Sequence, residues 1–98
     1  MTRSPSAPKH LSTESKHLWR DILRDHEILD AAGFALLRQL CETLDDLRAA
    51  QTRVADDGLM IASERGLRPH PLIAAISEHR RQILATIRAL KLDISMED

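Results

Sequence analysis

Two stretches of the chain repeat apolar side chains at intervals of three and four residues. The first stretch runs through Leu37, Leu40, Leu44, Leu47 and Val54, with Gln51 at one step, and the second through Ile73, Ile76, Ile83, Ile87, Leu90 and Ile94, with Arg80 at one step. This alternation lines one narrow side of an α-helix, which is the arrangement that packs against another helix. Glycines and prolines between Gly58 and Pro71 interrupt any continuous helix. The pattern therefore predicts two long helices that form an antiparallel hairpin, and it marks these apolar residues as the seam of that hairpin or of an oligomer.

The residues at the ends of the apolar stretches predict where the helices begin and end. Ser, Thr and Asp side chains accept hydrogen bonds from the first amides of a helix, and proline loses no hydrogen bond in a first turn. The expected helices run from a cap at Ser12 or Thr13 to about Leu29, from a cap at Asp30 to about Asp56, and from Pro71 to about Lys91. Between the last two, residues 59–62 and 66–68 flank a turn and indicate a short β-hairpin, which we favour, or an ordered loop. The predicted fold class is all-α, a three-helix domain.

Composition limits how such a domain can build its core. The chain has 98 residues, of which 43% are apolar but only 2% are aromatic. A core made of Leu, Ile and Ala suits helices packed on helices, and we expect neighbouring subunits to complete part of it. The first ten residues are polar and rich in proline, and the last six are acidic. We therefore expect a flexible arm at 1–10, a helical domain at 11–92 and an acidic tail at 93–98.

The formal net charge of −1 conceals an uneven distribution. Residues 31–58 are mainly acidic, whereas residues 65–91 carry six basic residues against Glu78 alone. The basic stretch is the better candidate for contact with a polyanion, although a solvated helix face with acidic partners on the second helix explains it equally well. In an antiparallel pair, Arg80 would lie opposite Leu47 and close to Asp46. A salt link there is favoured over a DNA contact.

No residues are arranged for catalysis, and none for holding a cofactor or a metal ion. The five histidines are scattered, and no two have the four-residue spacing of a helical metal site. Cys41 is the only cysteine, so an internal disulfide is excluded, and a buried thiol is favoured over a nucleophile. The neighbouring carboxylates of residues 45–46 and 56–57 point in different directions on a helix and are interpreted as solvated or helix-end charges.

No apolar run is long enough to cross a membrane and no signal peptide is recognised, so we expect a cytoplasmic protein.

The order of several small motifs resembles a known family. These motifs are Ala7-Pro8, Leu11-Ser12, Trp19 on the first helix, Leu29, Leu40-Cys41 on the second helix, Gly58, Gly66, His70-Pro71 and Leu90-Lys91-Leu92. From Pro8 to about Ser95 the chain resembles the small terminase subunit of tailed phages and prophages, in its short single-domain family. It departs from that family at Gly33, His70 and Lys91, where an acidic residue, Asn and Gly are common.

The resemblance implies a non-catalytic packaging factor that works as a ring-shaped homo-oligomer. Such a subunit recognises double-stranded viral DNA in the bacterial host cytoplasm and presents it to the large terminase subunit, which holds the ATPase and the nuclease. A ring would repeat a weak basic face many times and so reconcile DNA binding with a charge of −1. The candidate DNA-binding residues are Lys9, Lys16, Arg20, Arg24, Arg81 and Arg88. The alternative is a helical-hairpin adaptor that binds only protein, and whether the first two helices form a helix-turn-helix stays open.

Overall fold

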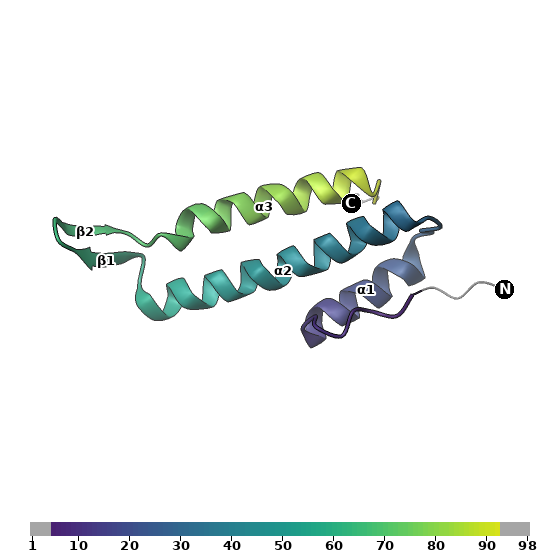
Figure 1. Ribbon diagram of the computed structural model, residues 1–98, viewed down its shortest axis with the longest axis horizontal. Helices are drawn as coiled ribbons and strands as arrows, with labels where there is room; N and C mark the ends of the chain where they lie inside the picture. Colours follow the sequence, from purple (N-terminus) through teal and green to yellow (C-terminus); the bar gives the residue numbers. More distant parts are fainter. Residues whose placement is uncertain (1–4, 93–98) are drawn as a thin grey trace, which may run out of the picture.

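Three helices and one small antiparallel sheet make up residues 5–92, which are the residues that this computed structural model describes. The elements are α1 (Thr13–Asp25), α2 (Ala31–Asp57), β1 (Met60–Ser63), β2 (Gly66–Pro69) and α3 (Leu72–Ala89). In Figure 1, α3 runs antiparallel along α2, α1 lies against the N-terminal half of α2, and the β-hairpin extends beyond the other end. The predominantly α-helical fold with three helices is confirmed, and the segment between α2 and α3 is a β-hairpin rather than a loop.

The longest element, α2, begins and ends close to the positions that the sequence predicts. The Asp30 carboxylate accepts a hydrogen bond from the Gly33 amide at 2.9 Å and so caps the first turn. At the other end, Gly58 adopts a φ of +93°, and its amide donates to the carbonyl of Val54 at 2.7 Å. The 27 residues of α2 span ~40 Å at the rise of an α-helix. Both of the other helices, α1 and α3, pack against this helix.

The prediction that α1 continues to about Leu29 is wrong. The helix ends at Asp25, and His26 has an extended backbone with φ −135° and ψ 146°. Leu29 is 80% exposed and takes no part in the buried stripe. The chain leaves the helix early because Asp30 must itself be extended to cap α2, and because Ile28 packs where Gly33 offers space. A Cβ at residue 33 would lie 2.7 Å from Cγ2 of Ile28.

A buried histidine fixes the base of the β-hairpin between α2 and α3. The ring of His70 is only 7% exposed; its Nδ1 accepts a hydrogen bond from the Leu72 amide at 3.1 Å, and its Nε2 lies 2.9 Å from the Asp57 carboxylate. Because Nδ1 is the acceptor, Nε2 carries the ring proton and donates it to Asp57. The hydrogen bond from His70, together with one from Arg53, lowers the pKa of Asp57. His70 therefore ties the end of α2 to the start of α3.

The helix α3 begins and ends within two residues of the prediction, at Leu72 and Ala89 rather than at Pro71 and about Lys91. Lys91 has a φ of +57°, and its amide donates to the carbonyl of Arg88. The amide of Leu92 donates to the carbonyl of Ile87. This pair of bonds is the Schellman motif, whose left-handed position favours glycine.

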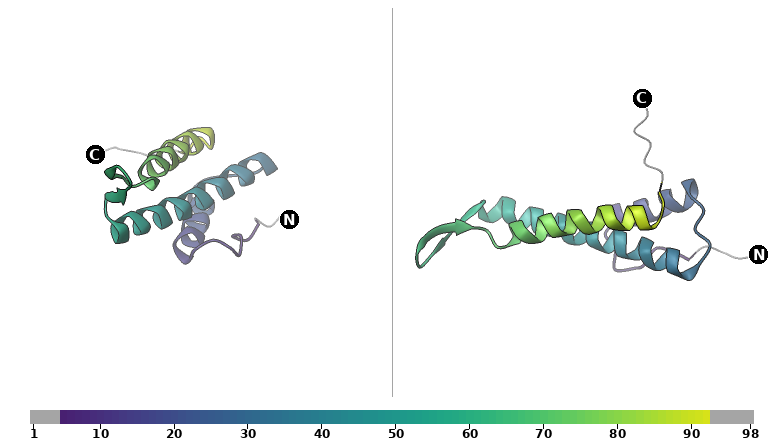
Figure 2. Two further views of the ribbon diagram at one scale, coloured as in Figure 1. Left: turned by 60° about the vertical axis from the view of Figure 1, so that its left-hand side comes forward. Right: turned by 90° about the horizontal axis from the view of Figure 1, so that it is seen from above.

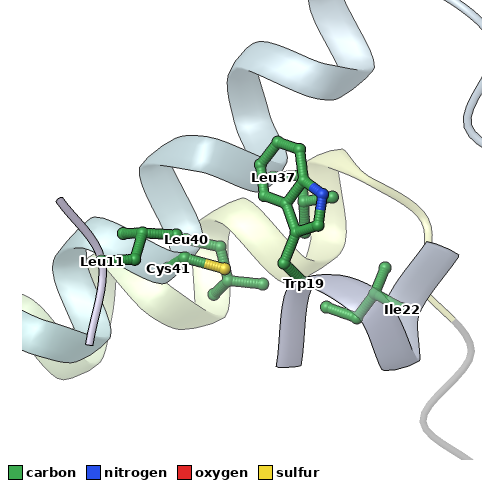
Figure 3. Close-up of a cluster of buried hydrophobic side chains, with 6 residues drawn as sticks. All are labelled: Leu11, Trp19, Ile22, Leu37, Leu40 and Cys41. Atoms are coloured by element: carbon green, nitrogen blue, oxygen red, sulfur yellow. The ribbon is translucent and has the colours of Figure 1, made fainter. Parts of the chain in front are cut away.

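The hydrophobic core lies where α1 meets the N-terminal half of α2. Its six buried side chains are Leu11, Trp19, Ile22, Leu37, Leu40 and Cys41, drawn in Figure 3. Of the predicted seam residues, Leu37, Leu40 and Val54 are buried, whereas Leu44, Leu47, Ile73, Ile76, Ile83, Ile87 and Leu90 are half-buried. Leu37 and Leu40 of α2 cluster with side chains of α1, and Ile83 and Ile87 of α3 pack against the same cluster. This part of the seam therefore contacts both helices that neighbour α2. Ile94 of the predicted pattern and the acidic tail predicted at 93–98 lie outside the described residues.

The salt link predicted for Arg80 does not form. Among the described residues, no carboxylate lies within 4.0 Å of the Arg80 guanidinium, and both Arg80 and Asp46 are exposed. The half-buried polar residue at this level is the neighbouring His79, whose Nδ1 has no hydrogen-bond partner among residues 5–92. The imidazole of His79 is therefore partly covered, whereas Arg80 is left to solvent.

Candidate nucleic-acid interface

A network of polar side chains attaches the start of α1 to the middle of α2. Asp45 accepts hydrogen bonds from the Ser12 amide at 2.8 Å and from the Ser15 hydroxyl at 2.7 Å. Arg48 lies 3.2 Å from the same carboxylate and donates to the Ser15 oxygen at 3.0 Å. Ser15 is completely buried, so its hydroxyl needs these partners. The network places α1, and with it the basic side chains of α1, at a fixed position on α2.

The interpretation of Asp45 as a solvated charge is wrong. Its side chain is 23% exposed, and it acts as a second N-terminal cap for α1 in addition to Ser12. Partial burial opposes ionisation, but the hydrogen bonds from Ser12 and Ser15 and the charge of Arg48 outweigh it and lower the pKa of Asp45. The sequence shows two adjacent aspartates, and nothing in their spacing tells the partly buried Asp45 from the exposed Asp46.

The residues before α1 fold back along that helix. The indole Nε1 of Trp19 donates to the carbonyl of Pro5 at 3.2 Å, and the amide of Leu11 donates to the carbonyl of Pro8 at 3.3 Å. His10 lies 2.6 Å from the carboxylate of Glu42 on α2. Hydrogen bonds from Arg38 and then His10 lower the pKa of Glu42, so the carboxylate is ionised. These contacts place Lys9 beside α1.

A hollow forms between this N-terminal segment and α1. Its volume is about 470 Å³, and its lining consists of Pro5, Ser6, Ala7, Lys9, Lys16, Trp19, Arg20, Leu23 and Arg24. Four of the six predicted DNA-binding residues therefore surround one surface depression. Three of them, at positions 16, 20 and 24, follow one another at single-turn intervals along α1, while the fourth comes from the segment before the helix.

The basic residues of the hollow differ in how far their charge is already neutralised. Arg24 lies 3.2 Å from Asp21 and 3.0 Å from Asp25, and the hydrogen bond to Asp25 is the main cause of its raised pKa. Lys9, Lys16 and Arg20 have no carboxylate within 4.0 Å among residues 5–92. The hollow thus presents three unpaired positive charges at its rim and one paired arginine, an arrangement that attracts anions.

The other two predicted residues lie elsewhere. Arg81 and Arg88 are on α3, two helical turns apart, and neither lines the hollow. Arg81 lies 3.3 Å from Glu78, whereas Arg88 has no such partner within the described part of the chain. The structure therefore divides the six candidates into a group of four at the hollow and a pair on α3.

The single cysteine lies in the hydrophobic core, as the sequence favours. Cys41 is fully buried in the core, and its burial raises the pKa of the thiol to about 11, so it stays protonated at neutral pH. Residues 5–92 contain no group of three or more His, Cys, Asp or Glu side chains placed to hold a metal ion. Within the same span, no helix is long and apolar enough to cross a membrane.

The fold is that of a helical-hairpin domain whose basic side chains gather on an outer surface rather than in a catalytic pocket. Comparison with protein families gives a match to the family described as phage terminase, small subunit, over residues 13–98. The chain belongs to this family, and membership implies a role in phage DNA packaging. Neither the curated proteins nor the solved structures give a match to this chain.

Proposed function

We propose that this protein is a non-catalytic small terminase subunit that binds viral DNA at the hollow beside α1 and presents it to the large ATPase and nuclease subunit. The observation that carries the proposal is the gathering of Lys9, Lys16 and Arg20, all without acidic partners in residues 5–92, around one depression. Lysine and arginine side chains of this kind bind the phosphates of the DNA backbone. Family membership supplies the packaging context.

The hollow contacts the DNA backbone rather than the bases. Trp19 is only 3% exposed, and its indole N–H already donates to Pro5, so the ring is not free to stack on a base. Contacts made by Lys16 and Arg20 alone carry no sequence information. Recognition of a packaging start therefore depends on the shape of the DNA or on several copies acting together.

Assembly into a ring of identical subunits makes a weak site sufficient. One hollow with three unpaired charges binds weakly at physiological salt, and the whole chain carries a net charge of −1. Repetition of the same site around an assembly raises the overall affinity without any new contact. The few aromatic residues and the half-buried seam leave apolar surface that neighbouring copies can cover.

The site is tested by charge reversal in two matched pairs. Lys16→Glu with Arg20→Glu changes the hollow, and Arg81→Glu with Arg88→Glu makes the same change of charge on α3. We expect the first pair to abolish binding in a gel-shift assay at low salt, because each reversal replaces an attraction to phosphate with a repulsion. Removal of one phosphate-binding side chain also makes the slope of log affinity against log salt shallower by ~0.9. Unchanged DNA affinity of the Lys16/Arg20 variant would refute the hollow as the DNA-binding site. Unchanged affinity of the Arg81/Arg88 variant would remove α3 as a DNA-binding surface.

A second function, an adaptor that binds only protein, is favoured by one observation. Leu59, Leu67 and Leu84 are more than half exposed, so their apolar side chains are available for contact with another protein. Native mass spectrometry of the purified protein separates the two functions. A closed assembly of many subunits supports the packaging ring, whereas a stable monomer or dimer supports the adaptor.

A further inference from the structure

The β-hairpin has an apolar face that no other part of residues 5–92 covers. It extends past the ends of α2 and α3, as the views in Figures 1 and 2 show. Met60 pairs with Pro69 and Ala62 with Leu67, so the four side chains lie on one face, and all four are exposed. Leu67 is 71% exposed. Because an isolated two-stranded hairpin is marginally stable in water, this face indicates a binding partner.

The register shows which backbone groups point away from the hairpin. The His70 amide donates to the carbonyl of Leu59 at 2.8 Å, which makes residues 59 and 70 a hydrogen-bonded pair. Hydrogen-bonded and non-hydrogen-bonded pairs alternate along an antiparallel ladder. The pairs 60–69 and 62–67 are therefore non-hydrogen-bonded. Their N–H and C=O groups point outward, from β1 at Met60 and Ala62 and from β2 at Leu67 and Pro69.

The two edges of the hairpin differ in their capacity to accept another strand. On β2, Pro69 has no N–H at an outward-facing position, and Arg68 adds a charge within the strand. Proline and charged residues protect natural sheet edges from unwanted pairing. On β1, the sequence Met-Ile-Ala-Ser contains neither, and its two outward-facing residues keep both their donors and their acceptors. The β1 edge is therefore open and unprotected.

We propose that the β1 edge binds an extended segment of another protein as a third strand of this sheet. The segment would exchange backbone hydrogen bonds with Met60 and Ala62, and it would carry apolar side chains at alternate positions on the side of the exposed face. The segment cannot have proline at positions whose backbone N–H would donate to β1. This inference rests on the proposed function, within which the chain that supplies the segment is the large terminase subunit.

A second copy of this chain fits the β1 edge less well. Pairing of β1 with β1 of a neighbour has two-fold symmetry, so it joins two chains and cannot continue around a ring. Pairing of β1 with β2 of a neighbour would lack one hydrogen bond, because Pro69 has no backbone N–H to donate. In a ring of more than two copies, the β1 edge of each copy remains available to a different protein.

The base of the hairpin holds this edge in place before any partner arrives. His70 contacts Leu59, the residue before β1, through its backbone, and it contacts α2 through Asp57 and α3 through the Leu72 amide. The turn at the other end is closed by a hydrogen bond from the Ser63 hydroxyl to the carbonyl of Gly66 at 2.6 Å. A preformed edge loses little conformational entropy when a strand is added.

Proline substitution tests the edge with a matched control. Ala62→Pro removes an outward-facing donor of β1 and leaves the hydrogen bonds of the hairpin intact, because residue 62 is in a non-hydrogen-bonded pair. Leu67→Pro makes the corresponding change on β2, and Leu67→Ala, which keeps the amide, measures separately the loss of the Leu67 side chain from the exposed face. The binding partner is the full-length large subunit of the same packaging system, titrated by biolayer interferometry onto the full-length small subunit. We expect Ala62→Pro to weaken binding about tenfold, since a strand-addition hydrogen bond is removed and the proline ring obstructs the approach. Leu67→Pro should remain within about threefold of Leu67→Ala, because the amide at position 67 lies on the β2 edge, away from the added strand.

Hydrogen exchange on the unmodified protein gives a second measurement that does not depend on how the variants fold. The amides of Met60 and Ala62 should exchange more slowly when the large subunit is added, while the amide of Leu67 should not change. Equal binding of the large subunit by wild type and Ala62→Pro would refute the proposal that the β1 edge is the binding site. An equal loss of affinity in both proline variants, with Leu67→Pro measured against Leu67→Ala, would refute it too. A change in subunit number with unchanged large-subunit binding would assign the edge to a second copy and likewise refute it. Failure of the wild type to bind the large subunit would overturn the proposed function as well.

Discussion

Replacement of Asp45 by alanine should cost more stability than any other single charge removal on α2. The carboxylate accepts hydrogen bonds from the Ser12 amide, the Ser15 hydroxyl and Arg48, and the buried Ser15 depends on it. Hydrogen bonds to a charged group contribute ~1.5–3 kcal/mol each, but the side chain is 23% exposed and water would replace part of the loss. We therefore expect Asp45→Ala to lower the free energy of unfolding by about 3 kcal/mol in total. For a domain of this size, that corresponds to a fall in Tm of ~12–24 °C.

The neighbouring Asp46 provides the control for this prediction. Asp46 is exposed and forms no ion pair within residues 5–92, so Asp46→Ala should change the stability by less than ~0.5 kcal/mol. Both variants are compared by urea unfolding followed by circular dichroism at pH 7 and at one protein concentration, because assembly would shift the midpoint. Equal stability of the two variants would refute the structural role assigned to Asp45.

The stabilisation by Asp45 should also depend on pH. The pKa of this carboxyl is lowered on folding, so the unfolded chain binds the proton more readily. The advantage of wild type over Asp45→Ala is then complete above the unfolded pKa of ~3.9 and is lost as the pH falls through the lower pKa of the folded state. A difference between the two proteins that stays constant from pH 7 to pH 2 would contradict this assignment.

Two further substitutions test the ends of the helices, each by the same unfolding assay. Lys91→Gly should stabilise the protein by about 1 kcal/mol, because a φ of +57° disfavours a side chain; a loss of stability would show that the lysine itself contributes there. Gly33→Ala should destabilise by about 1 kcal/mol, because overpacking of ~1–3 kcal/mol against Ile28 exceeds the gain in helix propensity. A more stable Gly33→Ala variant would mean that Ile28 moves aside freely.

The sequence predicted the helices best where local chemistry decides them. The cap at Asp30, the stop at Gly58 and the apolar spacing from Leu37 to Val54 are all local signals, and they gave α2 within about one residue. The prediction of where α1 ends was wrong because His26 and Leu29 continue a helical spacing in the sequence. The true end is set by the packing of Ile28 against Gly33 of α2. Local patterns do not contain that contact.

The candidate site was predictable in its residue types but not in its grouping. Spacing placed Lys16, Arg20 and Arg24 along one helix, but only the fold of the preceding segment brings Lys9 to them. The roles of Asp45 and His70 were missed for the same reason, since their partners are 33 and 13 residues away in the chain. His70 had one sequence signal, its place immediately before the proline that opens α3.

The two proposed contacts lie at opposite ends of α2, and this separation has a functional consequence. The hollow is formed on α1, which packs against the N-terminal half of α2, whereas the hairpin follows the C-terminal end of the same helix (Figure 1). Because α2 is a continuous helix of 27 residues, ~40 Å long, DNA at one end and a protein strand at the other do not compete for space. Both contacts are also fixed to α2 by hydrogen-bonded polar groups, at the partly buried Asp45 and at the buried His70. The two proposals together therefore place DNA and the large subunit on one small subunit at the same time, as presentation of one to the other requires.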